Sequence, residues 1–262
     1  MVLALTRAVR PREVTEVMMA MGNEAGGVWT ATGFPTLMAP SVMFPARRVR
    51  IPGPGVVKRQ FLIARLVGRL GGKPSMLIYT DGSCFYDAER HHISRGGCSF
   101  VFNTTQDGTI SFPLEDKGPD GSERPHTSNR AALRAVIGAL KYRDWPAENW
   151  RRVVIGTDSA YVTRGSTMWI RSWAQRGWLT PGKSPVSNQD LWRELSATFG
   201  QYAKAGCEVS FMAITREQNI SADAAAKVAV DTVNKTPLDS KSVHRTKKKL
   251  KDGPTIKQDR PI

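Results

Sequence analysis

The sequence predicts an α/β fold: a mixed five-stranded sheet flanked by helices, with basic extensions at both ends. Three observations favour this class. In the second half of the chain, short apolar segments rich in strand-forming residues alternate with amphipathic segments of helical period. The first three strand-like segments follow one another without a helix between them, which is typical of a meander. Hydrophobic residues make up 40% of the 262 residues, so the chain can bury a core.

Five segments have the composition of strands. The first is apolar and ends at the turn pair Asp81-Gly82. The second and third are joined by the turn signal Gln106-Asp107-Gly108. The fourth is apolar, and the fifth alternates between apolar and polar residues. We expect strands at residues 76–80, 97–103, 109–112, 152–157 and 207–213.

Four segments have the period of helices. In the first, Leu133, Val136 and Ile137 share one face, and either Thr127 or Ser128 can cap its start. The last is rich in alanine, so it can pack closely on a sheet. We expect helices at residues 128–142, 167–177, 187–202 and 219–233.

The regular elements define one domain between two basic extensions. We place the domain at residues 74–233, a largely irregular extension at 1–73 and a disordered tail at 234–262. Residues 47–73 contain eight basic residues and no acidic one, and residues 60–70 can form a short basic amphipathic helix. The net charge of +15 and the pI near 10.1 favour a polyanionic partner, nucleic acid before an acidic membrane. The basic runs can also be solvated arms or nuclear-targeting segments.

Cysteine content and hydropathy restrict the type of protein. Cys84, Cys98 and Cys207 form no CxxC pair, which argues against a disulfide framework and a structural zinc site. No apolar run approaches the ~20 residues that a membrane span needs. Residues 1–10 are mildly apolar and basic, but acidic residues follow soon after. We expect a monomer in the nucleus or cytoplasm, with mitochondrial targeting left open.

Three aspartates in short motifs are the main candidates for chemistry. Asp81 and Asp158 each follow an apolar strand, and Asp223 lies on the last helix. Neighbouring strands are about 4.8 Å apart, so carboxylates at adjacent strand ends can share one ion. Oxygen ligands favour Mg²⁺ or Mn²⁺ over Zn²⁺. Each aspartate alone could equally be a turn, cap or surface residue.

The order and spacing of five segments resemble one known family, type 1 ribonuclease H. The resemblance covers residues 76–230. Residues 169–192 look like the family's basic handle and the helix that follows it. The other matching motifs are Tyr79-Thr80-Asp81-Gly82-Ser83-Cys84, Thr127-Ser128-Asn129-Arg130-Ala131, Thr157-Asp158-Ser159-Ala160-Tyr161-Val162, and Arg216-Glu217-Gln218-Asn219 through Asp223.

The resemblance implies a chemistry and a substrate. The family cuts the RNA strand of RNA–DNA hybrids endonucleolytically with two Mg²⁺ ions. By resemblance, Asp81 and Asp158 would hold one ion, and Asp81 with Asp223 the other. The family's glutamate in the first helix falls on Ala132 here. Losing one anionic ligand should lower occupancy and misplace the ion, and a misplacement of ~1 Å can cost on the order of 10²-fold in rate.

Two other features bear on activity. Glu89 or Glu123 could substitute for the missing acid. The segment before Asp223 is short and lacks the histidine that many family members carry, although some active members look like this. We expect all four histidines of the chain to lie on the surface.

The resemblance also implies contacts to nucleic acid. Tyr161 and Trp169 would flank sugars of the DNA strand, while Thr127 and Asn188 would contact a DNA phosphate. Pro125 stands where many members have an arginine, with Arg124 adjacent. Three further residues lie where the family reads RNA 2′-hydroxyls, the group that distinguishes RNA from DNA. These residues are Ser83, Cys84 and Asn129.

The leading hypothesis is therefore a ribonuclease H-fold protein for RNA–DNA hybrids with impaired cleavage. One alternative is a non-catalytic module that binds hybrids or double-stranded RNA. Another is an interaction domain of a ribonucleoprotein, in which the fold is only a scaffold. A transposase or integrase relative fits less well, because the handle segment looks like that of ribonuclease H.

Overall fold

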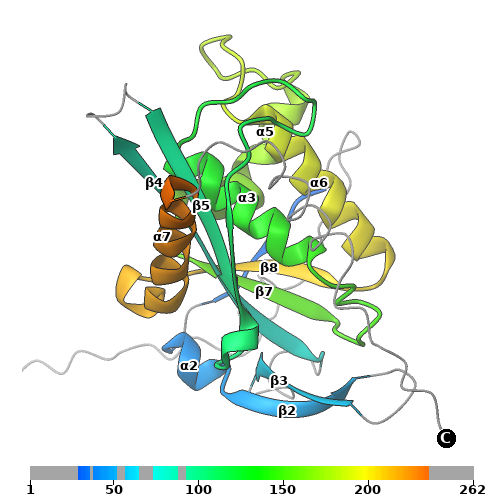
Figure 1. Cartoon of the computed structure of the whole chain (residues 1–262). Helices are drawn as coiled ribbons and strands as arrows, with labels where there is room; N and C mark the ends of the chain where they lie inside the picture. Colours follow the sequence, from blue (N-terminus) through cyan, green and yellow to red (C-terminus); the bar gives the residue numbers. More distant parts are fainter. Residues whose placement is uncertain (1–28, 36–37, 52–56, 65–72, 88–92, 236–262) are drawn as a thin grey trace, which may run out of the picture.

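The computed structural model describes residues 29–35, 38–51, 57–64, 73–87 and 93–235, and its centre is one mixed sheet (Figure 1). The strands are β1 (Thr32–Gly33), β2 (Ala46–Ile51), β3 (Val57–Ile63), β4 (Ser75–Asp87), β5 (Ile93–Val101), β6 (Thr109–Pro113), β7 (Arg152–Thr157) and β8 (Glu208–Ala213). The sheet has eight strands in the order β1-β8-β7-β4-β3-β2, with β5 paired to β4 and β6 paired to β5.

The strands combine a meander with parallel pairs. β4, β5 and β6 are antiparallel neighbours, because short connections let consecutive strands pair directly. β7 runs parallel to β4 on one side and to β8 on the other. Parallel neighbours need long crossover connections: α3 lies in the connection that leads from the meander to β7, and α4, α5 and α6 lie between β7 and β8.

Three long helices cover the two faces of the sheet. The helices are α2 (Pro40–Met43), α3 (Ser128–Lys141), α4 (Ala160–Arg164), α5 (Ile170–Gln175), α6 (Gln189–Lys204) and α7 (Ile220–Lys235), with 3₁₀ turns η1 (Gln106–Gly108) and η3 (Arg216–Gln218) and a π-helical segment η2 (Gly165–Trp169). α3 packs on β4 and β5 with α6 beside it, and α7 packs on β4, β5 and β6 (Figure 1).

Two glycines let α3 and α7 approach the β4–β5 hairpin backbone to backbone. A Cβ at Gly82 of β4 would lie 2.0 Å from the backbone nitrogen of Ala132 in α3. A Cβ at Gly97 of β5 would lie 2.2 Å from the carbonyl oxygen of Ala226 in α7. Gly82 pairs with Cys98, one residue beyond Gly97, and successive residues of a strand point to opposite faces. The two helices therefore sandwich the hairpin.

The core has two parts, one on each face of the central strands. Alternate residues of β4 and β7 point into each part, as expected for strands that are buried on both sides. Met76 and Val153 belong to the larger cluster, under α3 and α6. Leu77 and Val154 belong to the smaller one, which Phe34 and Phe44 of the N-terminal segment close.

The structure confirms the mixed sheet flanked by helices. Each of the five expected strands and four expected helices has a counterpart, β4 to β8 and α3, α5, α6 and α7. The limits of the expected domain at residues 74–233 stay a prediction. Within the described residues, none of the helices has the length and hydrophobicity to cross a membrane.

The N-terminal region differs from the expectation of an irregular segment. Residues 46–51 and 57–63 form β2 and β3, and the helix expected at residues 60–70 is wrong for residues 60–63. β3 pairs with the first residues of β4, before β5 joins that edge at Tyr79. The free edge of β4 there provides the pairing that turns this segment into a strand. Residues 65–70 and the tail from 236 onward lie outside the described residues.

Candidate active site

Asp81 lies in the middle of β4 rather than at its end. The expectation that a strand ends at Asp81 is wrong, because β4 stays paired with β5 as far as Asp87. The parallel pairing of β4 with β7 stops earlier, at Tyr79 and Gly156. Asp158 follows the end of β7, as expected, and each aspartate lies two residues beyond that last pair. The two carboxylates are therefore on neighbouring strands at the same level of the sheet.

The three aspartates share one electrostatic environment. Burial, with smaller contributions from the charges of Asp158 and Asp223, raises the pKa of Asp81 to about 6. The backbone N–H of Gly82, which donates to Asp81 Oδ1 at 2.8 Å, and the charge of Arg216 act in the opposite direction. Asp81 is thus a half-buried carboxylate whose negative charge is poorly compensated, and a divalent cation would relieve it.

The other two carboxylates have protein partners. Asn219 Nδ2 donates to Asp158 Oδ1 at 2.9 Å, and Arg216 Nε lies 3.5 Å from Asp158 Oδ2. Lys227 Nζ lies 2.6 Å from Asp223 Oδ2, one helical turn away. Within the described ranges, no group of three or more His, Cys, Asp or Glu side chains is arranged to hold a metal ion. The charge and the oxygen donors of the three aspartates suit a hard cation. In this structure their side chains contact protein groups instead.

Ala132 is buried beside this cluster. Only 5% of Ala132 is exposed, and its backbone touches Gly82, the residue that follows Asp81. A methyl group thus stands where the resemblance requires a carboxylate. Of the two acids that could substitute, Glu123 lies in the exposed loop before α3, in a backbone bridge with Lys117. Glu89 lies outside the described residues.

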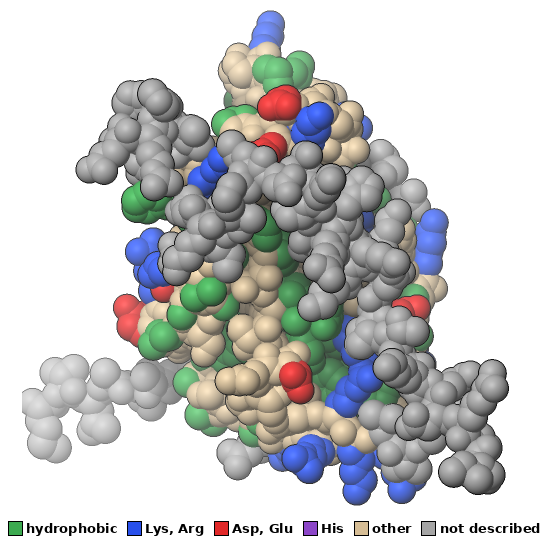
Figure 2. Space-filling view, viewed as in Figure 1, with side chains coloured by type: hydrophobic (Ala, Val, Ile, Leu, Met, Phe, Trp, Pro, Cys, Tyr) green, Lys and Arg blue, Asp and Glu red, His purple; other side chains and the backbone are tan. Residues whose placement is uncertain are grey.

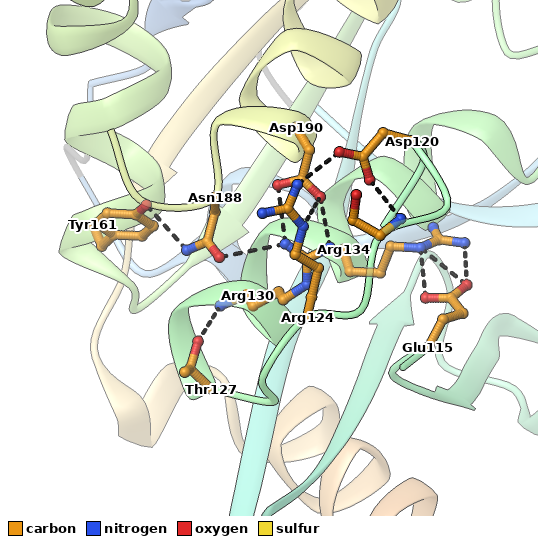
Figure 3. Close-up of polar contacts among 10 residues, drawn as sticks. Glu115, Asp120, Arg124, Thr127, Arg130, Arg134, Tyr161, Asn188 and Asp190 are labelled. Atoms are coloured by element: carbon orange, nitrogen blue, oxygen red, sulfur yellow. Dashed lines mark hydrogen bonds and ion pairs between the residues drawn. The ribbon is translucent and has the colours of Figure 1, made fainter. Parts of the chain in front are cut away.

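The starts of α3 and α6 lie side by side and carry Thr127 and Asn188, the two residues expected to contact a phosphate (Figure 3). Thr127 is the N-cap of α3, and its Oγ1 accepts from the backbone N–H of Arg130 at 3.1 Å. Asn188 precedes α6 in the left-handed conformation, with φ 57°. Its Nδ2 donates to the Tyr161 hydroxyl at 3.3 Å, and Arg130 Nη1 lies 3.5 Å from its Oδ1. The structure therefore brings Thr127, Asn188 and Tyr161 into one network.

A buried ion pair that the sequence did not reveal fastens these two helix starts together. Arg130 Nη1 and Nη2 donate to the two carboxylate oxygens of Asp190 at 3.0 and 2.7 Å (Figure 3). Arg124 Nε lies 3.7 Å from the same carboxylate, and Arg124 Nη2 donates to Asp120 at 2.6 Å. The two partners are 60 residues apart in the chain, so no local pattern could have indicated the pair.

Tyr161 and Trp169 belong to a connected aromatic cluster. Their ring centroids are 6.4 Å apart, and Trp192 Nε1 donates to the Tyr161 hydroxyl at 2.9 Å. Trp173 joins the cluster through both Trp169 and Trp192. Trp169 and Tyr161 are partly exposed, whereas Trp178 is buried. The partly exposed rings of the cluster lie beside Asn188, which contacts Tyr161.

The three residues expected at RNA 2′-hydroxyls lie on β4 and α3. Ser83 and Cys84 are half-buried on β4, opposite Gly97 and Gly96 of β5. Burial raises the pKa of the Cys84 thiol, so it is protonated at neutral pH. Asn129 is exposed in the first turn of α3.

His126 is buried, so the expectation of a surface histidine is wrong there. Its Nδ1 accepts from the backbone N–H of Gly96 at 2.8 Å, and its Nε2 lies 3.2 Å from Asp116. The ring thereby fills the space between the hairpin and the loop that leads to α3. The other histidines, at 91, 92 and 244, lie outside the described residues.

Comparisons with known proteins agree with this arrangement. The family model described as RNase H matches residues 73–231. A ribonuclease H of Zymomonas mobilis subsp. mobilis is 45% identical over 127 residues, which are 48% of this chain and 70% of that protein. A ribonuclease H of Herminiimonas arsenicoxydans is 34% identical over 161 residues, 60% of this chain and 95% of that protein. The solution structure of the PFV RNase H domain aligns with a TM-score of 0.46 at 20% identity, over 60% of this chain and 94% of that domain. Because the family match spans more than half of the chain and contains all three aspartates, this protein belongs to the RNase H family.

Proposed function

We propose that this protein binds RNA–DNA hybrids and that Ala132 impairs its cleavage of the RNA strand. Family membership and the net charge of +15 support the substrate class, since a hybrid is a polyanion. The impairment rests on one position, because the surrounding frame is intact.

The observation that carries the proposal is the contact between Gly82 and Ala132. It fixes α3 against β4 next to Asp81, so that position 132 borders the aspartate cluster. An acid at that position would add a fourth negative charge to Asp81, Asp158 and Asp223. With alanine there, the cluster keeps its place in the fold and lacks one donor.

The residues that would hold metal are Asp81, Asp158 and Asp223, with Mg²⁺ or Mn²⁺ as the ion and two ions in the family. Such ions, when bound, activate water and stabilise the leaving oxygen in phosphodiester hydrolysis. The chain itself positions the carboxylates. Gly82 N–H holds Asp81, and Asn219, which also donates to the carbonyl of Thr80, holds Asp158.

The proposed hybrid surface runs from the aspartates to the starts of α3 and α6. The Thr127 hydroxyl accepts from Arg130 N–H, which leaves its proton to donate to a phosphate at the helix N-terminus. Asn188 would contact the same phosphate, while Tyr161 and Trp169 would flank DNA sugars. Ser83, Cys84 and Asn129 would face RNA 2′-hydroxyls. Such contacts are to backbone groups, so binding should be largely independent of sequence.

The test compares the natural chain with Ala132→Glu and Ala132→Gln on a labelled hybrid with Mg²⁺ or Mn²⁺. Glutamine has the size of glutamate without its charge, so it is the matched control. We expect Ala132→Glu to raise the cleavage rate by on the order of 10²-fold, and Ala132→Gln to leave it near the natural level. Without metal, Ala132→Glu should also melt at a lower temperature than Ala132→Gln, because it adds a buried like charge. Equal cleavage by the natural chain and Ala132→Glu would show that Ala132 does not limit activity.

A second candidate function, non-catalytic hybrid binding, is favoured by the partners of the aspartates. Asp223 is paired with Lys227, and Asp158 with Arg216 and Asn219, so both charges are partly compensated by the protein itself. If neither the unchanged chain nor its Ala132→Glu and Ala132→Gln variants cut the hybrid but all of them bind it, this second function is correct.

A further inference from the structure

We infer that the β2–β3 ribbon is an additional nucleic-acid surface, outside the candidate active site. We call the outward face of this ribbon, formed by Arg48, Arg50 and Lys58, the basic ribbon face, and its partner is the phosphate backbone of a duplex. The inference rests on the proposed hybrid binding and extends it to a segment that lies outside the matched family region, which begins at residue 73.

The strand register places these three side chains on one face. In the antiparallel β2–β3 pair, Arg50 lies opposite Lys58 and Arg48 lies opposite Gln60. The alternate residues of β2, Val49 and Ile51, pack against the main core. Side chains alternate along a strand, so Arg48 and Arg50 point away from that core. Arg48, Arg50 and Lys58 are exposed.

The charges of this face have no acidic partner among the described residues. Arg50 and Lys58 are directly opposed, and like charges in that position destabilise a strand pair. Among the described residues, no hydrogen bond or ion pair engages the side chains of Arg48, Arg50 or Lys58. The sequence has no aspartate or glutamate between Glu24 and Asp81. No acid in the described part of the chain relieves this repulsion, which a bound polyanion would relieve.

The basic ribbon face leads away from the aspartate cluster. The face begins at the pair of Ala46 and Leu62, which line a cavity of about 320 Å³. Gln218 and Asn219 line the same cavity. Asn219 in turn donates to Asp158. Since alternate strand residues are about 7 Å apart, Arg48 and Arg50 lie roughly 7 and 14 Å farther along the ribbon. Lys and Arg side chains gather at the lower edge of the molecule, where β2 and β3 lie (Figure 2).

Two alternative roles for the basic ribbon face predict different binding behaviour. In the first alternative, the charges only prevent the edge strand β2 from pairing with strands of other chains. In that case, hybrid affinity would not depend on these particular residues. An acidic membrane could also compensate the ribbon. Duplex is favoured because the ribbon and the proposed hybrid surface flank the same cluster of aspartates.

The test measures hybrid affinity of the full-length chain by fluorescence anisotropy in EDTA, which prevents cleavage. The variant Arg48→Gln/Arg50→Gln is compared with Arg151→Gln/Lys204→Gln, a control that removes the same charge from two other exposed residues. Each lost phosphate contact lowers the slope of log K against log salt by about 0.9. We expect the ribbon variant to lose about 1.8 from the slope and the control to keep the natural slope. Arg48→Lys/Arg50→Lys should keep the natural slope, which separates charge from folding.

Each result has a distinct meaning. If the natural chain does not bind hybrid at low salt, the proposed function itself fails. If it binds and the ribbon and control variants have equal slopes, the inference alone is overturned. If Arg48→Gln/Arg50→Gln loses binding to vesicles of phosphatidylserine and phosphatidylcholine but keeps its slope on hybrid, the ribbon binds membranes and the inference is wrong.

Discussion

The buried pair of Arg130 and Asp190 gives the sharpest stability prediction. It joins the first turns of α3 and α6, which carry the candidate phosphate contacts Thr127 and Asn188. The perturbation is Arg130→Ala, which leaves the Asp190 carboxylate without its bidentate partner. Both side chains are nearly buried, with 3% and 6% of their surface exposed.

The expected magnitude follows from burial. Removing one partner of a buried ion pair typically costs about 3–5 kcal/mol, because the remaining charge is uncompensated. Arg124, 3.7 Å from the same carboxylate, offsets part of that, so we expect about 3 kcal/mol. In a domain of this size the corresponding decrease in Tm is about 6–12 °C. The exposed pair of Lys141 and Glu194 provides the control, and Lys141→Ala should cost less than about 1 kcal/mol.

The assay is urea denaturation followed by circular dichroism, with hybrid binding measured on the same samples. Arg130→Met combined with Asp190→Leu removes both charges and should regain most of the loss, because no charge is left unpaired. Burial alone would raise the pKa of Asp190, but the hydrogen bond and charge of Arg130 outweigh it and hold that pKa below its usual range. The stability from this pair should thus be complete above pH ~4, the unfolded pKa, and be lost as pH falls through the lower folded pKa.

The reasoning is refuted if Arg130→Ala costs no more than Lys141→Ala. It is also refuted if the double replacement is as unstable as Arg130→Ala, since the loss would then come from packing rather than from an unpaired charge. A stable Arg130→Ala variant with weakened hybrid binding would show that Arg130 acts mainly by positioning Thr127 and Asn188.

Two further predictions concern the hairpin between α3 and α7. Gly97→Ala should lower the free energy of unfolding in urea by at least about 2 kcal/mol, because the new Cβ would lie 2.2 Å from the carbonyl oxygen of Ala226. Gly33→Ala is the control and should cost far less, because the space around Gly33 is open. Equal losses in the two variants would contradict this prediction. Asp81→Asn should stabilise the metal-free protein by about 1 kcal/mol at pH 7, since burial raises the Asp81 pKa to about 6 and makes its charged form unfavourable in the fold. The gain in stability should shrink as pH falls from about 6 toward 4, because Asp81 is already protonated in the folded protein there. The measurement is urea denaturation in EDTA at pH 7 and pH 5, and an equal gain at both pH values would disprove the prediction.

Local patterns were sufficient to predict most of the elements. The helix α3 begins at a threonine cap and keeps its apolar period to Leu140. A stretch of about fifteen residues is therefore sufficient to predict both of its ends. The three aspartates were identified because each lies in a short motif next to an apolar strand or on the last helix. The pairing of Asp223 with Lys227 could also have been predicted, from the i,i+4 spacing alone.

Features that depend on distant partners were not predictable in this way. Residues 60–63 look like the start of a basic helix until the free edge of β4 is known, because a strand there needs a partner from elsewhere in the chain. The same holds for the continuation of β4 past Asp81, which β5 stabilises. Burial of His126 likewise depends on Gly96, thirty residues away.

The sequence by itself determined the order of the main elements from β4 to α7, the identity of the aspartates and the substitution at Ala132. Those features depend on local period, capping and residue type. The tertiary structure decided that Ala132 contacts Gly82 beside Asp81, and that the pair of Arg130 and Asp190 joins the starts of two helices. It also decided that two arginines and one lysine share one face of the β2–β3 ribbon. Each of these is a contact between segments far apart in the chain, and packing and strand register, rather than local propensity, set such contacts.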